Sequence, residues 1–418
     1  MEMLKIKGQK NFNKEVFAPP SKSFSHRYII GAFLSGKKAK VSNIIYSKDT
    51  IATLGAIEKM GALVKRYDNS VEIEFDKIND NIEIDCIESA STLRFIIPIV
   101  AALGIKAKIY GRKSLMMRPL DAYTDLFDRE KIGYEYKKGE YIKIFGKMNL
   151  DKYEIDGNVS SQYITGMLFA LSVSEGKKVL KIRKTLTSRP YVDITLDVLR
   201  FYGINVKNND YKSFEIEGRY TAKDSYVEGD YSNGCAFIGA ALLGGKIKIN
   251  NLLRNSVQGD KKFIDFMQSL GGKIKICKNY IECEKSNLVS GKTFDISNCP
   301  DIAPVLSAVC AFAEDKTVIT GIQRLRVKES DRAAAIVKTL TDLGISTQCD
   351  DEKIVITGAK KAAGNTVDTF NDHRIAMMAA VMSVMCDEKI TLLTPMCVEK
   401  SYPAFYHDFD GIIKTEKC

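Results

Sequence analysis

The sequence predicts a two-domain α/β protein that is built from six copies of one helix-and-strand unit. The chain has 418 residues, which is more than one ordinary hydrophobic core holds, so we expect two domains. One pattern recurs along it: an amphipathic helix, a glycine, a short strand, a polar turn and a second strand. Six such units divide evenly into two domains of three units each.

The glycines of the repeat lie at nearly equal intervals. They are Gly61, Gly133, Gly203, Gly271, Gly344 and, in a weaker sixth copy, Gly411. The intervals run from 67 residues (344 to 411) to 73 residues (271 to 344). Each glycine follows an apolar periodic stretch, where the end of a helix favours a left-handed residue, so we expect each to terminate a helix.

The composition is that of a globular protein, with 45% hydrophobic and 27% charged residues. The N-terminus has no apolar signal-peptide core, and no apolar run is long enough to span a membrane. Ten cysteines occur without a CxxC pair, and there are only three histidines. We therefore expect a cytoplasmic protein with reduced thiols, no membrane contact and no metal centre.

The net charge of +10 raises the possibility of a nucleic-acid partner. The lysines are scattered, however, and no RRM, KH or zinc-finger pattern is present. We interpret the excess partly as a composition bias and partly as a sign of an anionic small-molecule substrate, and we expect no nucleic-acid partner.

Hydroxyl and cationic side chains gather at the predicted starts of helices. Examples are Ser21-Lys22-Ser23 with Arg27, Glu88-Ser-Ala-Ser-Thr-Leu-Arg94, Ser160-Ser161-Gln162 and Ser188-Arg189-Pro190. Backbone N–H groups at a helix start suit a phosphate or carboxylate, although the Walker pattern is missing. Taken singly, each of these starts is as well explained by an ordinary helix cap.

The most highly charged stretch is Arg326-Val-Lys-Glu-Ser-Asp-Arg332. Helix formers follow it, so it is predicted to open a helix, with Lys328 and Glu329 on the same face as Arg332. A solvated, capped helix start is the ordinary alternative. The cations expected to converge on one place are Lys22, Arg27, Arg94, Arg118, Lys328, Arg332, Arg374 and Lys400. Asp301 and Glu329 are the carboxylates that could transfer protons there.

Together these motifs resemble the 5-enolpyruvylshikimate-3-phosphate synthase (3-phosphoshikimate 1-carboxyvinyltransferase) family, from Pro20 to Pro403. The motifs that carry the resemblance are Ser21-Lys22-Ser23 with Arg27, Arg118-Pro119, Ser160-Ser161-Gln162, Ser188-Arg-Pro-Tyr191, Glu228-Gly-Asp230, Arg326–Arg332 and Asn371-Asp-His-Arg374. The resemblance implies an inside-out α/β barrel of two domains, each with three βαβαββ units and with helix N-termini facing the interdomain cleft. Domain one would comprise residues 1–20 and 230–418, and domain two, inserted after the first strand, residues 21–229.

The implied activity is transfer of the enolpyruvyl group of phosphoenolpyruvate to the 5-hydroxyl of shikimate-3-phosphate, by addition and then elimination of phosphate. This reaction belongs to chorismate and aromatic amino acid biosynthesis, and the family works without a metal or organic cofactor. The substrates would be the only partners of an expected monomer.

The resemblance also implies roles for single residues. Asp301 would take the proton from the 5-hydroxyl, Glu329 would handle the methylene proton, and Lys22 would meet both ligands. Shikimate-3-phosphate would be held by Lys22, Ser23, Arg27, Ser160, Ser161, Gln162, Ser188, Asp301, Arg324 and Lys328. Phosphoenolpyruvate would be held by Lys22, Ala90, Arg118, Gln162, Arg332, Arg374 and Lys400.

The sequence departs from the family pattern at a few positions. Arg324 stands where many members carry Asn, Asn233 replaces a serine, and Ala90 replaces the glycine of members that are sensitive to glyphosate. The nearest rival is the enolpyruvyl transferase that acts on UDP-N-acetylglucosamine, but the loop 111–118 lacks the cysteine usual there. An inert anion-binding scaffold is the alternative from another class, and intact Asp301 and Glu329 argue against it.

Overall fold

Six four-stranded sheets of one design make up the computed structural model, which describes residues 2–174, 176–289 and 291–417. In the sheet β6-β7-β9-β8, for example, the first two strands are parallel and the remaining pairs are antiparallel. Because parallel neighbours need a crossover connection, a helix lies between them, and a second helix precedes the closing hairpin. The resulting βαβαββ order is the one that the family resemblance implies, and it contains the helix and two strands that the glycine spacing predicts.

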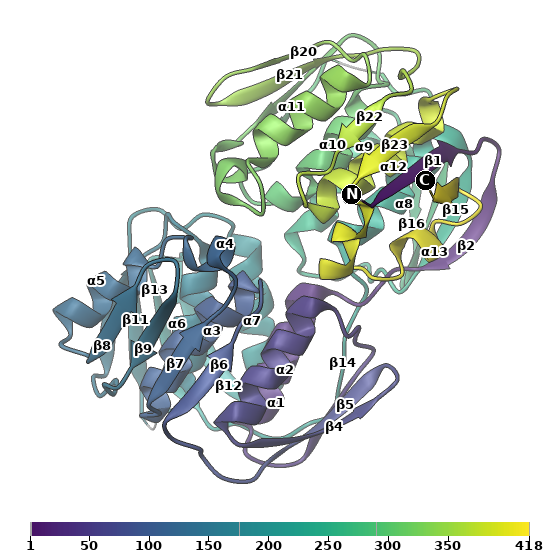
Figure 1. Cartoon of the computed structure of the whole chain (residues 1–418). Helices are drawn as coiled ribbons and strands as arrows, with labels where there is room; N and C mark the ends of the chain where they lie inside the picture. Colours follow the sequence, from purple (N-terminus) through teal and green to yellow (C-terminus); the bar gives the residue numbers. More distant parts are fainter. Residues whose placement is uncertain (1, 175, 290, 418) are drawn as a thin grey trace. The chain divides into compact units, whose positions relative to one another are not determined.

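Contacts divide the chain into two compact units (Figure 1). One, the terminal unit, comprises Met1–Pro19 and Gly229–Cys418, and the other, the inserted unit, comprises Pro20–Glu228. The boundaries expected from the sequence, after residues 20 and 229, each lie one residue further along the chain. Each unit contains three of the six sheets.

The inserted unit holds the sheets β14-β3-β5-β4, β6-β7-β9-β8 and β10-β11-β13-β12. Its first repeat consists of α1 (Lys22–Leu34), β3 (Ala39–Ser42), α2 (Lys48–Met60), β4 (Ala62–Tyr67) and β5 (Ser70–Phe75), completed by β14 (Ser225–Tyr226). The second consists of β6 (Ile82–Asp85), α3 (Ala90–Leu103), β7 (Ala107–Tyr110), α4 (Lys113–Met116), α5 (Asp121–Arg129), β8 (Tyr134–Lys137) and β9 (Tyr141–Ile144). The third consists of β10 (Lys152–Asp156), α6 (Ser161–Ser172), β11 (Lys178–Arg183), α7 (Arg189–Phe201), β12 (Ile204–Asn209) and β13 (Ser213–Gly218).

The terminal unit repeats this plan. Its first repeat consists of β2 (Asn13–Phe17), α8 (Tyr231–Gly244), β15 (Lys246–Asn250), η1 (Gly259–Lys261), α9 (Lys262–Ser269), β16 (Lys273–Ile276) and β17 (Tyr280–Glu284). The second consists of β18 (Thr293–Asp295), η2 (Pro300–Ile302), α10 (Ala303–Cys310), β19 (Lys316–Thr320), η3 (Gln323–Val327), α11 (Arg332–Asp342), β20 (Thr347–Cys349) and β21 (Lys353–Thr357). The third consists of β22 (Thr366–Asp368), α12 (His373–Met382), η4 (Ser383–Met385), β23 (Ile390–Leu393), η5 (Pro395–Lys400), α13 (Phe405–Asp408), β24 (Ile413–Lys417) and β1 (Met3–Gly8).

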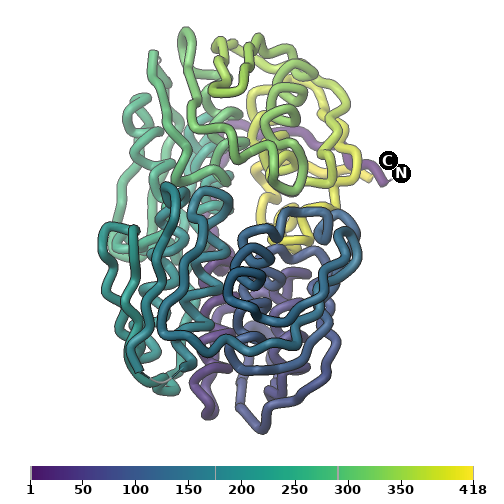
Figure 2. The backbone as a smooth tube through the Cα atoms, turned by 90° about the vertical axis from the view of Figure 1, so that its left-hand side faces the viewer, coloured from purple at the N-terminus to yellow at the C-terminus, as the bar shows by residue number. Residues whose placement is uncertain are grey.

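The two ends of the chain meet in one sheet of the terminal unit. Strand β1 pairs with β23 on one side and with β24 on the other, both antiparallel, and the termini lie side by side (Figure 2). The first strand of the chain therefore completes the last repeat.

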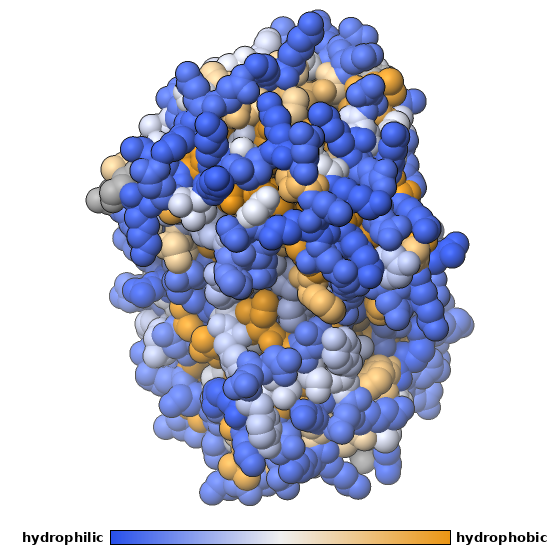
Figure 3. All heavy atoms as spheres, turned by 90° about the vertical axis from the view of Figure 1, so that its right-hand side faces the viewer, coloured by the Kyte–Doolittle hydropathy of each residue, from blue (hydrophilic) through white to orange (hydrophobic). Residues whose placement is uncertain are grey.

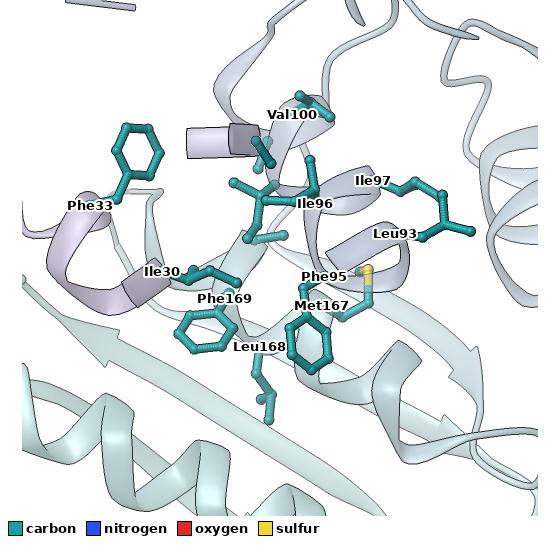
Figure 4. Packing of buried hydrophobic residues seen from close by; sticks show 14 of the residues in the cluster. Ile30, Phe33, Leu93, Phe95, Ile96, Ile97, Val100, Met167, Leu168 and Phe169 are labelled. Atoms are coloured by element: carbon teal, nitrogen blue, oxygen red, sulfur yellow. The ribbon is translucent and has the colours of Figure 1, made fainter. Parts of the chain in front are cut away.

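Each unit packs around central helices that are apolar on nearly all sides, as a helix buried between other elements must be. In the inserted unit these are α1, α3 and α6, and Figure 4 shows Ile30, Phe95, Ile96, Leu168 and Phe169 within that core. Polar residues cover most of the face in Figure 3. Within the described residues, no helix is both long and apolar enough to cross a membrane.

The structure corrects three local expectations. Gly61, Gly203, Gly271, Gly344 and Gly411 have positive φ after their helices, but after α5 this conformation falls on Lys131 (φ 54°) and not on Gly133. The pair Arg118-Pro119 is also predicted by its sequence to begin a helix with proline in the first turn, but that helix, α5, begins only at Asp121. The helix expected from residue 326 begins only at Arg332, after the cap Asp331, because η3 and a loop precede it.

Candidate functional site

In the inserted unit, the Arg27 guanidinium joins three helices. Its Nε donates to Thr195 Oγ1 of α7 (2.8 Å), and its Nη2 donates to Thr165 Oγ1 of α6 (3.2 Å) and to the Tyr191 carbonyl (2.9 Å). Its Nη1 donates to the Ser23 carbonyl within α1 (2.7 Å). These bonds use four of the five N–H donors of an arginine. We call this residue and the helix starts around it the Arg27 cluster.

Arg27 is buried to 3% exposure and lies over the Phe95 ring, 5.1 Å from its centroid. Burial lowers the pKa of Arg27 to about 9, because a charge is disfavoured away from water. The guanidinium is still protonated at neutral pH. It is therefore a fixed positive charge at the base of the Arg27 cluster.

The helix starts around Arg27 are capped by the hydroxyl residues that the sequence singled out. The Ser21 side chain accepts from Phe24 N at the start of α1, Ser89 from Thr92 N at the start of α3, and Ser160 from Gln162 N at the start of α6. Ser161 begins α6 and is buried. Ser188 precedes α7 with a left-handed backbone (φ 53°) and is connected to the Arg27 contacts through the Tyr191 N–H, which donates to its carbonyl (3.2 Å).

Gln162 links α6 to α3. Its Oε1 accepts from Arg94 Nη1 (2.6 Å), and its Nε2 donates to Ser91 Oγ (3.0 Å). Ala90, beside Ser91, is the first residue of α3 and is partly buried. Arg94 and Ser91 were not among the predicted ligands, although Arg94 belongs to the cations that the sequence was expected to bring together.

Lys22 forms an ion pair with Asp49 of α2, with Nζ 3.1 Å from Oδ2. Sequence reasoning missed Asp49, because 27 residues separate the two and no local pattern marks it.

Arg118 lies before α5 and is half-exposed, and its side chain makes no hydrogen bond or ion pair with any other residue in the described ranges.

In the terminal unit, the Arg332 guanidinium contacts three carboxylates. Nε donates to Asp372 Oδ2 (2.9 Å), Nη1 to Asp301 Oδ1 (2.9 Å), and Nη2 to Glu329 Oε2 (2.6 Å). Arg332 is only 1% exposed. Burial alone would lower its pKa, but the charges of Asp372, Glu329 and Asp301 outweigh it and raise the pKa above its usual value. We call this group, with Lys328, the Arg332 cluster.

Asp301 receives a second cation. Lys328 Nζ lies 2.9 Å from Asp301 Oδ1, the same oxygen that Arg332 contacts. Burial tends to raise the pKa of Asp301, but the charges of Lys328, Arg332 and Arg374 hold it well below its usual value. Burial lowers the pKa of Lys328, and the charge of Asp301 opposes that shift. Asp301 is therefore ionised at neutral pH.

Arg374 lies in the first turn of α12, whose cap is Asp372. Its Nη1 donates to Asn233 Oδ1 of α8 (3.1 Å), so Asn233, which departs from the family pattern, orients this arginine. Lys400 ends η5, and Arg324 lies in η3, both half-buried.

Direct contacts join Asp301 to Lys328 and Arg332, and Arg332 to Glu329, as expected of residues that converge on one place. The local structure differs from the prediction. Lys328 and Glu329 lie in a loop and not on the helix of Arg332. The sequence suggested a surplus of cations, whereas these cations are largely neutralised by carboxylates. Asp372, which the prediction left out, is the most buried of those carboxylates at 0% exposure. Its place two residues before Arg374, at a helix start, was the available signal.

The Arg27 cluster combines a buried cation with helix N-termini, which suit an anionic ligand. The Arg332 cluster combines cations with carboxylates, which suit an anionic ligand and proton transfer. Among the described residues, no group of three or more His, Cys, Asp or Glu side chains could hold a metal ion.

Solved structures with this fold include an EPSP synthase from Acinetobacter baumannii, with a TM-score of 0.83, 22% identity and coverage of 100% of both chains. They also include the enolpyruvyl transferase NikO from Streptomyces tendae, with a TM-score of 0.78, 15% identity and coverage of 100% of this chain and 99% of that one. The fold is therefore that of the enolpyruvyl transferases.

The family follows from sequence comparison. A family model described as EPSP synthase (3-phosphoshikimate 1-carboxyvinyltransferase) matches residues 6–409. The 3-phosphoshikimate 1-carboxyvinyltransferase of Clostridium novyi is 38% identical over 99% of this chain and 98% of its own length. That of Clostridioides difficile is 40% identical over 98% of this chain and 97% of its own length. The chain belongs to the EPSP synthase family.

Proposed function

We propose that this protein transfers the enolpyruvyl group of phosphoenolpyruvate to the 5-hydroxyl of shikimate-3-phosphate and releases phosphate. Membership of the EPSP synthase family supports the reaction. The observation that carries the chemical assignment is the contact of Arg332 with both Asp301 and Glu329. It gathers two carboxylates and an anion-binding cation within one cluster, which is what proton transfer beside a bound anion needs.

Shikimate-3-phosphate is proposed to bind the Arg27 cluster. The fifth N–H donor of Arg27, with the hydroxyl of Ser23, would hold its carboxylate. Ser160, Ser161 and Ser188, at the starts of α6 and α7, would hold its phosphate, because helix N-termini favour anions. The further proposed contacts are Lys22, Gln162, Asp301, Arg324 and Lys328.

Phosphoenolpyruvate is proposed to bind a second set of cations, which shares Lys22 with the first. They are Lys22, Arg118, Arg332, Arg374 and Lys400, with Gln162 and Ala90 beside it. Arg118 supports this role because its side chain has no ion-pair partner among the described residues. Arg332 makes four hydrogen bonds to carboxylates, which leaves one N–H donor for the ligand.

In the proposed reaction, the 5-hydroxyl oxygen adds to C2 of phosphoenolpyruvate and its proton goes to Asp301. Glu329 enters the reaction in its protonated form and gives its proton to C3, which becomes a methyl group. The C2–O bond to phosphate then breaks, and the leaving phosphate takes the proton that Asp301 holds. The methyl group returns a proton to Glu329, which restores the double bond in the enolpyruvyl product. Asp301 and Glu329 thus end the scheme in the protonation states in which they began it.

The ion pairs of Asp301 bear on its strength as a base. A carboxylate with a strongly lowered pKa binds protons weakly, so Asp301 is a poor base while Lys328 and Arg332 hold it. The anionic groups of the substrates would draw these cations away from Asp301. Its pKa would then rise, and the base would become effective only when both substrates are bound.

The experiment that tests this function is phosphate release from phosphoenolpyruvate with shikimate-3-phosphate or UDP-N-acetylglucosamine as acceptor. We expect turnover with shikimate-3-phosphate only. Turnover with the nucleotide sugar would favour the other enolpyruvyl transferase, and no turnover with either would favour an inert scaffold.

A monomer in the cytoplasm is part of the proposal. The nine cysteines in the described part of the chain have free thiols, and most are buried, which suits a reducing compartment. Light scattering on the purified protein tests the monomer, and fractionation of the source cells tests the compartment.

A further inference from the structure

We propose that Tyr163 is a positioning residue that holds Arg118 in place for phosphoenolpyruvate. Its hydroxyl donates a hydrogen bond to the carbonyl of Pro119, the residue that follows Arg118. The inference rests on the role given to Arg118 under the proposed function, and goes beyond it by naming the side chain through which that arginine is anchored.

Tyr163 itself is rigidly held. It lies in the first turn of α6, beside Gln162, and is 0% exposed. The guanidinium of Arg94 lies 5.1 Å from the centroid of its ring, and the Tyr123 ring packs against it edge to face at 4.8 Å. Such contacts fix the plane of an aromatic ring, so the direction of the Tyr163 hydroxyl is fixed as well.

Tyr123 connects this ring to the neighbouring helix. Its hydroxyl donates to the Arg94 carbonyl of α3 (2.6 Å) and lies 3.2 Å from the Tyr163 carbonyl of α6. Gly166 permits this close approach, because a Cβ there would lie 2.4 Å from both the Arg94 carbonyl oxygen and the Tyr123 hydroxyl. Tyr163 therefore lies where α3, α5 and α6 pack closely against one another.

Arg118 needs such an anchor because its own segment has little regular structure. The one-turn helix α4 precedes it, and α5 begins only three residues later. Its N–H donates to the Leu115 carbonyl (3.0 Å), while its side chain is half-exposed. An arginine that binds an anion gains affinity when its backbone is already in place, because less freedom is lost on binding.

The hydroxyl of Tyr163 is a dependable donor. Burial raises the pKa of Tyr163, so the hydroxyl remains protonated throughout the pH range of an enzyme assay. Removing it leaves the Pro119 carbonyl without this partner and keeps the ring contacts with Arg94 and Tyr123. The hydroxyl also contacts the Arg94 guanidinium. Tyr163→Phe therefore removes the polar contacts of one hydroxyl and leaves the packing unchanged.

The test compares steady-state kinetics of wild type, Tyr163→Phe, Arg118→Lys and the double variant. We expect Tyr163→Phe to raise KM for phosphoenolpyruvate about 3- to 10-fold, the scale of one lost hydrogen bond. KM for shikimate-3-phosphate and kcat should change by less than about twofold, since the remaining contacts are intact. Arg118→Lys should also raise KM for phosphoenolpyruvate, and the double variant should show less than the product of the two single effects.

Tyr202→Phe is the matched control. Tyr202 is also 0% exposed and lies at the C-terminal end of α7. Its hydroxyl donates to a backbone carbonyl as well, that of Tyr28 (3.1 Å). We expect similar thermal stability for the two Tyr→Phe variants and a change in KM for phosphoenolpyruvate only in Tyr163→Phe. If that KM is unchanged in Tyr163→Phe, or if its effect multiplies fully with Arg118→Lys, the positioning role is wrong while Arg118 keeps its role. If Arg118→Lys leaves the KM unchanged, the role of Arg118 fails and the inference fails with it.

Discussion

Arg332 and Asp372 form a two-pronged ion pair in which neither side chain is exposed by more than 1%. Nε of Arg332 lies 2.9 Å from Asp372 Oδ2, and Nη2 lies 3.2 Å from Oδ1. Asp372 also caps α12 by accepting from Arg374 N (2.9 Å). One carboxylate therefore holds the side chain of Arg332 and the backbone of Arg374, both of which are proposed to bind phosphoenolpyruvate.

Asp372→Asn should destabilise the terminal unit by about 1.5–3 kcal/mol, the scale of a hydrogen bond to a charged group, because Arg332 keeps its contacts with Asp301 and Glu329. Asparagine is as good a helix cap as aspartate, so the capping bond is kept and the loss reports the charge. Urea unfolding of the variant measures it. In the exposed pair Arg326–Asp351, Asp351→Asn should change stability by less than about 1 kcal/mol. Equal losses in the two variants would contradict this account of Asp372.

Asp301→Asn and Glu329→Gln should each reduce kcat by about 100-fold or more, the usual scale for loss of a general acid or base. Binding of shikimate-3-phosphate, measured by calorimetry, should persist, because the Arg27 cluster is unchanged. Asp342→Asn, in an exposed pair with Lys338 of α11, is a control that should keep wild-type turnover. A variant of Asp301 or Glu329 that kept near wild-type kcat would show that its assigned role is wrong.

Lys328→Met should move the acidic limb of the pH profile of kcat/KM to higher pH. Among the cations that hold the pKa of Asp301 below its usual value, Lys328 has the largest effect, so its removal raises that pKa. A base works only when deprotonated, and kcat/KM reports the free enzyme. The substrates titrate alike in the assays of wild type and variant, so a difference between the two pH profiles comes from the protein. Lys338→Met removes an exposed lysine and should leave the limb in place, whereas a shift of equal size there would refute the interpretation.

The repeat was predictable from the sequence because it depends on local signals. Apolar periodicity and a residue that can adopt positive φ mark the ends of helices in every copy, and five of the six glycines have that conformation. The exception shows the limit of the rule. Lys131 adopts positive φ after α5, while Gly133 lies where a Cβ would come within 2.5 Å of the Phe145 ring. A glycine is needed there because of a close tertiary contact and not because a helix ends.

The candidate site was predictable in residue type but not in pairing. Charged motifs identified Lys22, Arg27, Asp301 and Arg332, whose partners come from distant parts of the chain. Thr195 is 168 residues from Arg27, and Asp372 is 40 residues from Arg332. Contacts of this kind depend on how helices of separate repeats pack, and no local pattern carries that information.

Ala90→Gly should increase inhibition by glyphosate. Ala90 begins α3 and is partly buried next to Ser91, which Gln162 contacts, so its methyl group lies in a packed part of the Arg27 cluster. Overpacking costs about 1–3 kcal/mol, which corresponds to about 5- to 150-fold in affinity. Phosphoenolpyruvate is shorter and should be affected less. The inhibition constant and KM of both proteins provide the measurement, and equal inhibition constants would exclude the steric explanation.

His26 is a buried neutral histidine that connects two helices beside the Arg27 cluster. Its Nδ1 lies 2.6 Å from Thr53 Oγ1 of α2, which is 2.7 Å from Thr92 Oγ1 of α3. Burial lowers the pKa of His26 to about 3, and the charges of Lys22 and Arg27 act in the same direction against that of Asp49. The folded protein therefore keeps this imidazole uncharged at any pH in which it functions.

Acidification should for this reason destabilise the inserted unit through His26. In the unfolded chain the imidazole has a pKa of about 6.5. Below that pH the unfolded state therefore binds a proton that the folded state does not bind. Stability is then lost by about 1.4 kcal/mol per pH unit between about pH 6 and the folded pKa. Urea unfolding at pH 7 and pH 5 should show a smaller acid loss in His26→Gln than in wild type. The exposed His407→Gln is the control and should behave as wild type, because it removes no buried side chain. An unchanged acid loss in His26→Gln would mean that other groups carry the pH dependence.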